Sequence, residues 1–121
     1  MQEVRQYHIK GAEIKREKSG HLIVGFSSQV MADEQLIALK DIEEKFFLAF
    51  YGCDLSRRNL EILVQLGVLE LGVFHSSFSD ADLTVLSQSN TLEHVKLHDT
   101  LVTQACIDEI KKQRPQLRIF I

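Results

Sequence analysis

Three histidines and one aspartate in the second half of the chain carry the side chains from which metal sites and acid–base catalysts are built. They are His75, His94, His98 and Asp99. Imidazole and carboxylate groups are common ligands of zinc and other transition metals. A histidine beside an aspartate is also the pairing of base and orienting group in a nucleophilic triad. Metal binding and catalysis are therefore the first two chemistries to weigh against the sequence.

The rest of the sequence supports neither chemistry. The spacing of these four residues matches no metal-binding motif, and the chain contains no CxxC, HExxH, GxSxG or glycine-rich phosphate loop. Ser76 follows His75, but it occupies a turn position that should face inward. No serine or cysteine is therefore placed to use a His75–Asp99 pair as its base. We expect no bound metal, no cofactor and no enzymatic activity.

The strongest signal in the chain is a repeat of about two dozen residues. Four aliphatic positions lie 24, 23 and 24 residues apart, namely Leu36, Leu60, Leu83 and Ile107. Each is followed three residues later by a second aliphatic residue, and each is preceded by a short alternating apolar run such as Val95 and Leu97. Alternation followed by an i, i+3 pair predicts a strand and then a helix in every copy.

Three segments display the repeat most clearly: KFFLAFYGCDLSRRNLEILVQLGV, VLELGVFHSSFSDADLTVLSQSNT and LEHVKLHDTLVTQACIDEIKKQRPQLRIFI. They resemble the leucine-rich repeat L-x-x-L-x-L-x-x-N-x-L, in its short bacterial form that ends T-D-x-x-L-x-x-L. The resemblance covers about residues 21–121. Its first position is polar in two copies, at His21 and Lys45, and its asparagine position is occupied by Gln29, Cys53, Ser76 and Thr100.

The resemblance implies an α/β fold, a leucine-rich-repeat solenoid with a parallel sheet on the concave side and helices on the convex side. We expect one domain over residues 1–121. Residues 1–20 should form an N-terminal cap, because two β-compatible runs flank a Lys-Ser-Gly turn and predict a hairpin. The expected repeats are residues 21–44, 45–67, 68–91 and 92–116, followed by a terminal strand at 117–121.

Composition excludes several classes of function. The chain has 121 residues and a net charge of -3, and it lacks the basic patch typical of nucleic-acid binders. No apolar run is long enough to span a bilayer, and the N-terminus MQEVRQYHIK has no apolar signal region. Cys53 and Cys106 are expected to be reduced thiols. These features predict a cytoplasmic protein that binds neither nucleic acid nor membrane.

Equivalent residues of a parallel stack align from strand to strand, which brings aromatic and ionisable side chains onto one face. The candidate partner-binding residues on this concave face are Phe47, Tyr51, Phe74, His75, His94, Lys96, His98 and Asp99. Their neighbours could instead cover the aromatic rings, and the histidines could simply be solvated. The opposite, convex side should carry solvated charges at Asp33, Glu34, Glu43, Glu44, Arg57 and Arg58.

The sequence thus favours a non-catalytic module that binds a protein partner through its concave face. The alternative is a compact α/β regulatory or enzymatic domain with a His/Asp site, which would place helices on both faces of its sheet and a ligand crevice where the strand order reverses. The C-terminal segment LRIFI predicts a strand with an unpaired edge, and a second copy could pair with it to form a homodimer.

Overall fold

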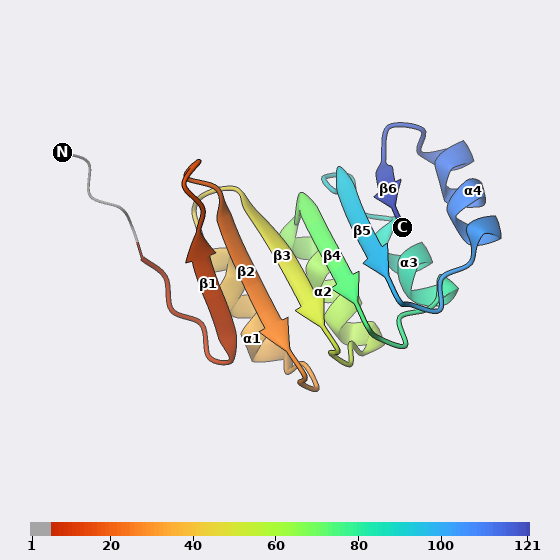
Figure 1. Cartoon of the computed structure of the whole chain (residues 1–121). Helices are drawn as coiled ribbons and strands as arrows, with labels where there is room; N and C mark the ends of the chain where they lie inside the picture. The colour runs from red at the N-terminus through yellow and green to blue at the C-terminus, as the bar shows by residue number, and fades with distance from the viewer. Residues whose placement is uncertain (1–5) are drawn as a thin grey trace.

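One six-stranded sheet runs through residues 6–121, the part of the chain that the computed structural model describes. Each strand lies beside the strand that precedes it in the sequence, without any reversal of order (Figure 1). The first pair is antiparallel, and every later pair is parallel. The strands are β1 (Ala12–Arg16), β2 (Leu22–Ser27), β3 (Phe46–Tyr51), β4 (Glu70–Phe74), β5 (His94–His98) and β6 (Arg118–Phe120).

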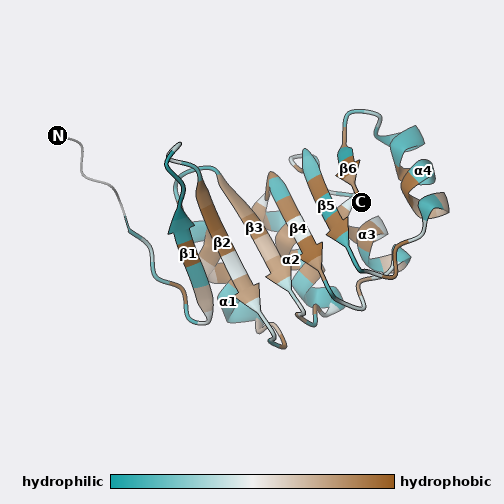
Figure 2. Cartoon of the chain, viewed as in Figure 1, coloured by the Kyte–Doolittle hydropathy of each residue, from teal (hydrophilic) through white to brown (hydrophobic). Residues whose placement is uncertain are grey.

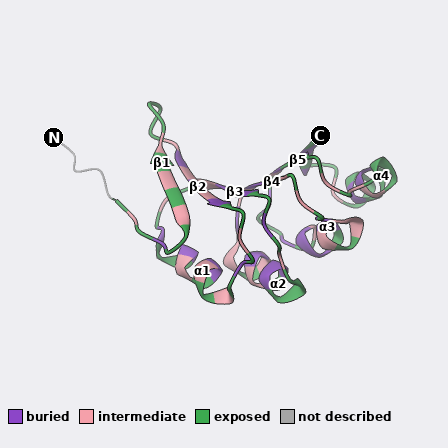
Figure 3. Cartoon of the chain, turned by 60° about the horizontal axis from the view of Figure 1, so that its bottom comes forward, coloured by how far each residue is buried: buried purple, intermediate pink, exposed green. Residues whose placement is uncertain are grey.

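Helices follow each parallel strand up to β5 and cover a single face of the sheet (Figure 3). They are α1 (Asp33–Ile37), which continues as a 3-10 turn η1 (Ala38–Asp41), α2 (Arg57–Leu66), α3 (Asp80–Leu86) and α4 (Gln104–Gln113). The predicted α/β class with a mostly parallel sheet is confirmed. The first copy, whose repeat pattern is the weakest, also has the shortest α-helix.

The predicted register of the parallel strands is confirmed. One row across the sheet pairs Ile23 with Phe47, Phe47 with Glu70, Glu70 with His94, and His94 with Arg118. The regular spacing of the repeat explains this result, because a nearly constant number of residues between strands returns each copy to the same position in its neighbour.

The predicted hairpin at the N-terminus is also confirmed for the described residues. β1 and β2 pair in antiparallel register from Ala12 opposite Phe26 to Arg16 opposite Leu22, and the Lys-Ser-Gly turn joins them. Arg16 joins β1 to the segment just before β3, because its Nη1 lies 2.6 Å from Oε1 of Glu44 and its Nη2 lies 3.1 Å from Oε2. Residues 1–5 of the expected cap lie outside the described part of the chain.

The core lies between the helices and the sheet face that they cover. All eight aliphatic residues of the i, i+3 pairs are buried: Leu36, Leu39, Leu60, Leu63, Leu83, Leu86, Ile107 and Ile110. In the first copy, Leu22 faces this core, whereas His21 is only half-buried. The alignment of this copy is nevertheless confirmed, because Val24, three residues after His21, is in register with Val95, three residues after Leu92.

Two of the residues that begin helices, Ser56 and Thr103, accept a hydrogen bond from the first turn of their helix. Oγ of Ser56 accepts from the amide of Asn59 at 3.0 Å, and Oγ1 of Thr103 accepts from the amide of Cys106 at 3.2 Å. At Ser79 the backbone amide of the first residue is the donor instead, and the Oδ2 atom of Asp82 in the first turn accepts its hydrogen bond at 2.8 Å. Each bond satisfies a backbone group that the helix itself leaves unpaired.

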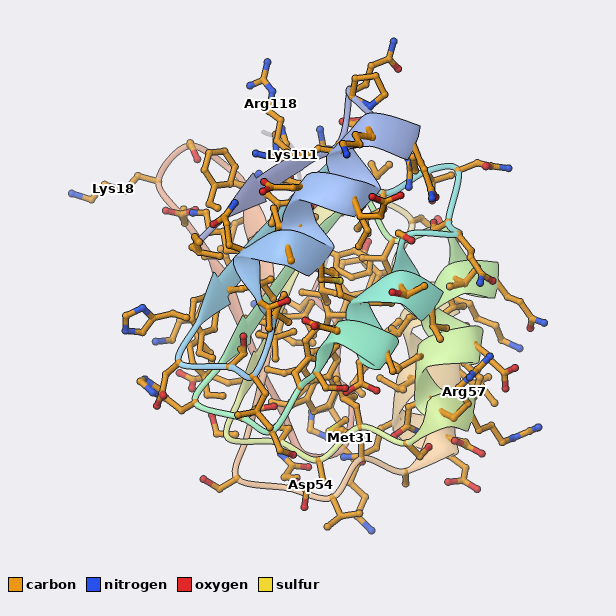
Figure 4. All side chains as sticks on the ribbon, turned by 90° about the vertical axis from the view of Figure 1, so that its right-hand side faces the viewer. Lys18, Met31, Asp54, Arg57, Lys111 and Arg118 are labelled. Carbon is orange, nitrogen blue, oxygen red and sulfur yellow. The ribbon has the colours of Figure 1, made fainter. Side chains whose placement is uncertain are left out.

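Charged residues on the helix side are more structural than the sequence predicts. Arg57 projects away from the sheet at one side of the molecule, as expected (Figure 4). Asp33, however, accepts hydrogen bonds from Nε of Arg58 and Nδ2 of Asn59, both at 2.8 Å. Arg58 is solvated as predicted, with 75% of its side chain exposed. The prediction is wrong for Asp33, which joins two neighbouring copies, and for Glu44, which is half-buried beside Arg16 of the N-terminal hairpin.

Two further predictions concern thiols and membrane helices. Cys53 is buried, Cys106 is half-buried, and both are free thiols. The Sγ of Cys53 lies 3.3 Å from the carbonyl oxygen of Phe26, so this thiol contacts the preceding strand. Within residues 6–121, no helix is sufficiently long and apolar to cross a membrane.

Candidate functional site

The sheet face that carries no helix, here called the open face, presents alternate residues of the strands. Side chains alternate between the two faces of a strand, so a residue next to a core position points outward. Rows across the open face follow the strand pairing. The structure brings the sequence-predicted residues together here, six on the strands and two just beyond them: Phe47, Tyr51, Phe74, His94, Lys96, His98, His75 and Asp99.

The middle of the open face has a floor of very small residues, Gly25, Ala49 and Gly72, which are neighbours in one row. A Cβ atom added to Gly72 would lie 2.6 Å from Cε2 of Phe74 and 2.8 Å from Cζ of Phe47. The two phenylalanine rings therefore occupy the space that a side chain at Gly72 would need. Ala49 is fully buried although no helix covers this face.

Phe47, Tyr51 and Phe74 form an aromatic shelf above this floor. The rings of Tyr51 and Phe74 are stacked, with centroids 5.0 Å apart and planes at 15°. Tyr51 is 43% exposed, and the two phenylalanines are half-buried. The rings are therefore partly covered by their neighbours and partly accessible to a partner. One side of the shelf covers the floor, and the other side faces solvent. The aromatic shelf lies on the more hydrophobic part of the sheet, since β1 is largely hydrophilic whereas β2 and β3 are more hydrophobic (Figure 2).

A cation borders the shelf on the β5 side. Nζ of Lys96 lies 5.5 Å from the ring centroid of Phe47, a distance at which the ring face attracts a positive charge. Lys96 is exposed, so its ammonium group is available to solvent or to a partner. The shelf therefore combines apolar area with a positioned charge, which is the composition of many protein interfaces.

His75, His98 and Asp99 form the carboxyl-end cluster, at the ends of β4 and β5. Nδ1 of His75 lies 3.0 Å from Oδ2 of Asp99, and the rings of His75 and His98 meet edge to face at 5.6 Å. The backbones of His75 and Asp99 are left-handed, with φ of 54° and 56°. Such a conformation costs an L-residue roughly 1–2 kcal/mol, which glycine would avoid. Gly52 occupies the position equivalent to His75 in the preceding copy, with φ 64°.

His21, Glu70 and His94 form the amino-end cluster, at the other ends of the strands. Glu70 lies between the two imidazoles, with Oε1 3.6 Å from Nε2 of His21 and Oε2 3.5 Å from Nδ1 of His94. Only 16% of the Glu70 side chain is exposed. Sequence reasoning missed His21 because it treated this residue only as a polar departure from the first repeat position. The alternation of Leu22, Val24 and Phe26 is the signal that could have placed it on the open face.

β1 adds two charged residues that sequence reasoning also missed. Glu13 pairs with Gly25, and Lys15 pairs with Ile23, so both side chains lie on the open face. Nζ of Lys15 is 3.0 Å from Oε1 of Glu13, and this hydrogen-bonded carboxylate raises the pKa of Lys15. The hairpin register was needed to find them, and the turn sequence alone did not specify it.

The predicted site residues lie on a surface and not in a cavity. In residues 6–121, no group of three or more His, Cys, Asp or Glu side chains could hold a metal ion. A cavity of about 440 Å³ lies where the chain enters β3 and β4, lined by residues such as Ile42, Phe46 and Val68. None of the eight predicted site residues lines it. The functional candidates therefore share an open surface.

Comparisons with protein-family models, with curated proteins and with solved structures found no match for this chain.

Proposed function

We propose that this chain is a non-catalytic protein-interaction module of the leucine-rich-repeat type, and that it docks a protein partner on its open face. In this proposal the strand-and-helix copies form a solenoid, and the open face is its concave side. The near-constant repeat, the sequential strand order and the placement of all four helices on one face support it.

The aromatic shelf is the observation that carries the proposal. Phe47 and Phe74 lie over glycine, and Tyr51 leaves 43% of its surface accessible. Aromatic side chains with a polar rim are the usual anchors of protein interfaces, where a few such residues supply most of the binding energy. Core packing does not require them, since the core is filled from the helix-covered face.

A capture experiment tests the proposal. The purified protein is immobilised and exposed to extract of the source cells, and a bound protein is then measured with purified components. Tyr51→Ala combined with Phe74→Ala and His98→Ala should weaken this binding by at least about 2 kcal/mol, because hot-spot truncations have effects of this size. Unchanged affinity would remove the open face from consideration.

The matched control replaces three exposed residues of α2 on the helix side, Arg57, Glu61 and Gln65, by alanine. This variant should bind like the parent, because these side chains project from the opposite side of the sheet. Thermal unfolding of both triple variants checks that each retains its fold. Loss of binding in the control alone would place the interface on the helices.

A second candidate is catalysis by the His75–Asp99 pair, and the 3.0 Å contact between their side chains favours it. An aspartate that orients an imidazole is a recurring base arrangement. The side chains of His75 and Asp99 are, however, 61% and 72% exposed, so water is not excluded from the pair. Hydrolysis of an activated ester that His75→Gln abolishes would favour this candidate over the interaction module.

A further inference from the structure

Four of the five histidines lie on the open face or at its edge. His21 and His94 belong to the amino-end cluster, and His75 and His98 belong to the carboxyl-end cluster. The fifth, His8, is exposed in the segment before β1. The aromatic shelf reaches from one cluster to the other, because Phe47 shares its row with Glu70 and His94, whereas Tyr51 and Phe74 share theirs with His98. A segment bound along the shelf would therefore meet imidazoles at both ends.

Each cluster combines two histidines with one carboxylate. Glu70 is shared by His21 and His94, at 3.6 and 3.5 Å. Asp99 contacts His75 at 3.0 Å, and His75 in turn contacts His98. With neutral imidazoles each cluster has a charge of -1, and with both imidazoles protonated it has a charge of +1. Both ends of the shelf therefore reverse sign together when the histidines are protonated.

The other charged groups near these clusters are balanced and do not mask the reversal. Lys15, Lys96 and Arg118 on the open face offset Glu13, Glu70 and Asp99, which gives 3 - 3 = 0 with neutral histidines. Near His21, the exposed Lys45 and Glu17 are of opposite sign. The titratable side chain of Tyr51 also lies beside the carboxyl-end cluster, in the row of Phe74 and His98. Protonation of the four imidazoles takes the face from 0 to +4.

The whole chain shows the same change at larger scale. Its net charge is -3 with neutral histidines, and protonation of all five gives -3 + 5 = +2. An acidic ligand is repelled by the chain in the first state and attracted to the open face in the second. Histidine is the side chain whose ordinary protonation range, near pH 6.5, makes this change accessible to cells.

We propose that the open face binds an acidic segment of a partner protein across the aromatic shelf, and that protonation of His21, His75, His94 and His98 strengthens the complex. This inference rests on the proposed interaction function and adds the chemistry of the partner. Apolar or aromatic side chains of the segment would lie on Phe47, Tyr51 and Phe74. Its carboxylates would meet the two imidazole clusters, Lys96 and Arg118.

The test uses a blocked synthetic peptide, Glu-Glu-Phe-Phe-Glu-Glu, titrated into the isotope-labelled protein and followed by backbone amide shifts. We expect about tenfold tighter binding near pH 5.5 than near pH 7.5 at the same ionic strength, because four charges of favourable sign are added. The shifts should centre on β3 to β5. Equal affinity at the two pH values, or no binding of the peptide at the lower one, overturns the inference.

Two variants isolate the histidines. The combined change of His21, His75, His94 and His98 to Gln should remove most of the pH dependence, whereas His8→Gln should retain it. Circular dichroism at both pH values verifies that each variant is folded. A pH dependence that survives the fourfold change overturns the inference, since the charge reversal would then originate elsewhere.

Two control ligands separate the inference from simpler electrostatics. The peptide Lys-Lys-Phe-Phe-Lys-Lys should bind more weakly at the lower pH, and a tighter complex would overturn the assignment of an acidic partner. The second control is a decamer of thymidylate. If it binds as tightly as the acidic peptide, the open face attracts anions in general, and the assignment of an acidic protein segment is overturned. The capture experiment uses neither peptide and therefore tests the proposed function separately. If a captured partner binds the parent but not the triple variant of Tyr51, Phe74 and His98, the proposed function stands even when this inference fails.

Discussion

The two faces of the sheet are built by the same strands and yet are filled in different ways. On the helix-covered face, Val24, Leu48, Leu71 and Val95 are buried in the core. On the open face, the neighbouring positions hold a floor of Gly25, Ala49 and Gly72, with aromatic rings and ionisable side chains above it. The first face is uniform from copy to copy, and the second changes from strand to strand.

This difference separates the face that stabilises the fold from the face to which we assign the proposed binding. Uniform aliphatic positions are what a stack of copies needs, because no copy can bury its own apolar face alone. The open face carries no such requirement, so its residues are free to differ. His75 and Asp99 even accept a left-handed backbone that glycine adopts more easily, at Gly52 for instance. The predictions below ask whether the two faces respond to mutation as differently as they are built.

The largest effect is expected in the core. Leu83 of α3 is fully buried, so Leu83→Ala should lower the free energy of unfolding by roughly 2–5 kcal/mol through lost contacts and a residual cavity. The matched control is Leu101→Ala, which removes the same atoms from a side chain that is 64% exposed. Urea unfolding of both variants measures the difference. Equal losses would refute the assignment of the core to the helix-covered face.

An intermediate effect is expected on the open face. Gly72→Ala brings a Cβ within 2.8 Å of the rings of Phe47 and Phe74, so these rings must shift. We expect a loss of about 1–3 kcal/mol, typical of overpacking, together with altered near-ultraviolet circular dichroism of the shelf. Gly25→Ala is the control, because its Cβ would meet Tyr51 at an ordinary 3.6 Å. Identical behaviour of the two variants would contradict the ring positions described here.

The smallest effect is expected where helices of neighbouring copies meet. The backbone amide of Thr103, and then its hydroxyl, donate hydrogen bonds to Asp80 and lower the pKa of this carboxyl below its ordinary 3.8. A lowered folded-state pKa stabilises the protein above the unfolded value, and this stabilisation is lost as the pH falls through the folded value.

Asp80→Asn should therefore lower the melting temperature at pH 7 and approach the parent below about pH 3.8. Thermal unfolding across this pH range measures the difference. The control is Asp54→Asn, which changes an exposed aspartate in the loop between β3 and α2 and should follow the parent at every pH. If the difference in melting temperature between Asp80→Asn and the parent stays constant with pH, ionised Asp80 does not have the stabilising role described here.

Much of this fold follows from periodicity alone. The spacing of Leu36, Leu60, Leu83 and Ile107 predicts the helix anchors and the parallel register of β2 to β6, and alternation predicts which side chains face the core. The positions of the N-caps at Ser56 and Thr103 follow from local chemistry. Each is a short-range property, repeated from copy to copy, so the sequence by itself determined them.

Tertiary structure decided what depends on contacts between copies. Glu70 meets both His21 and His94 only because β2, β4 and β5 lie in one sheet, and nothing in their local sequence specifies that contact. Phe47 and Phe74 cover Gly72 because two rings from adjacent strands fold toward the same gap. The orientation of a long side chain depends on its neighbours in space, and therefore the backbone pattern could predict which residues share the open face but not how they pair.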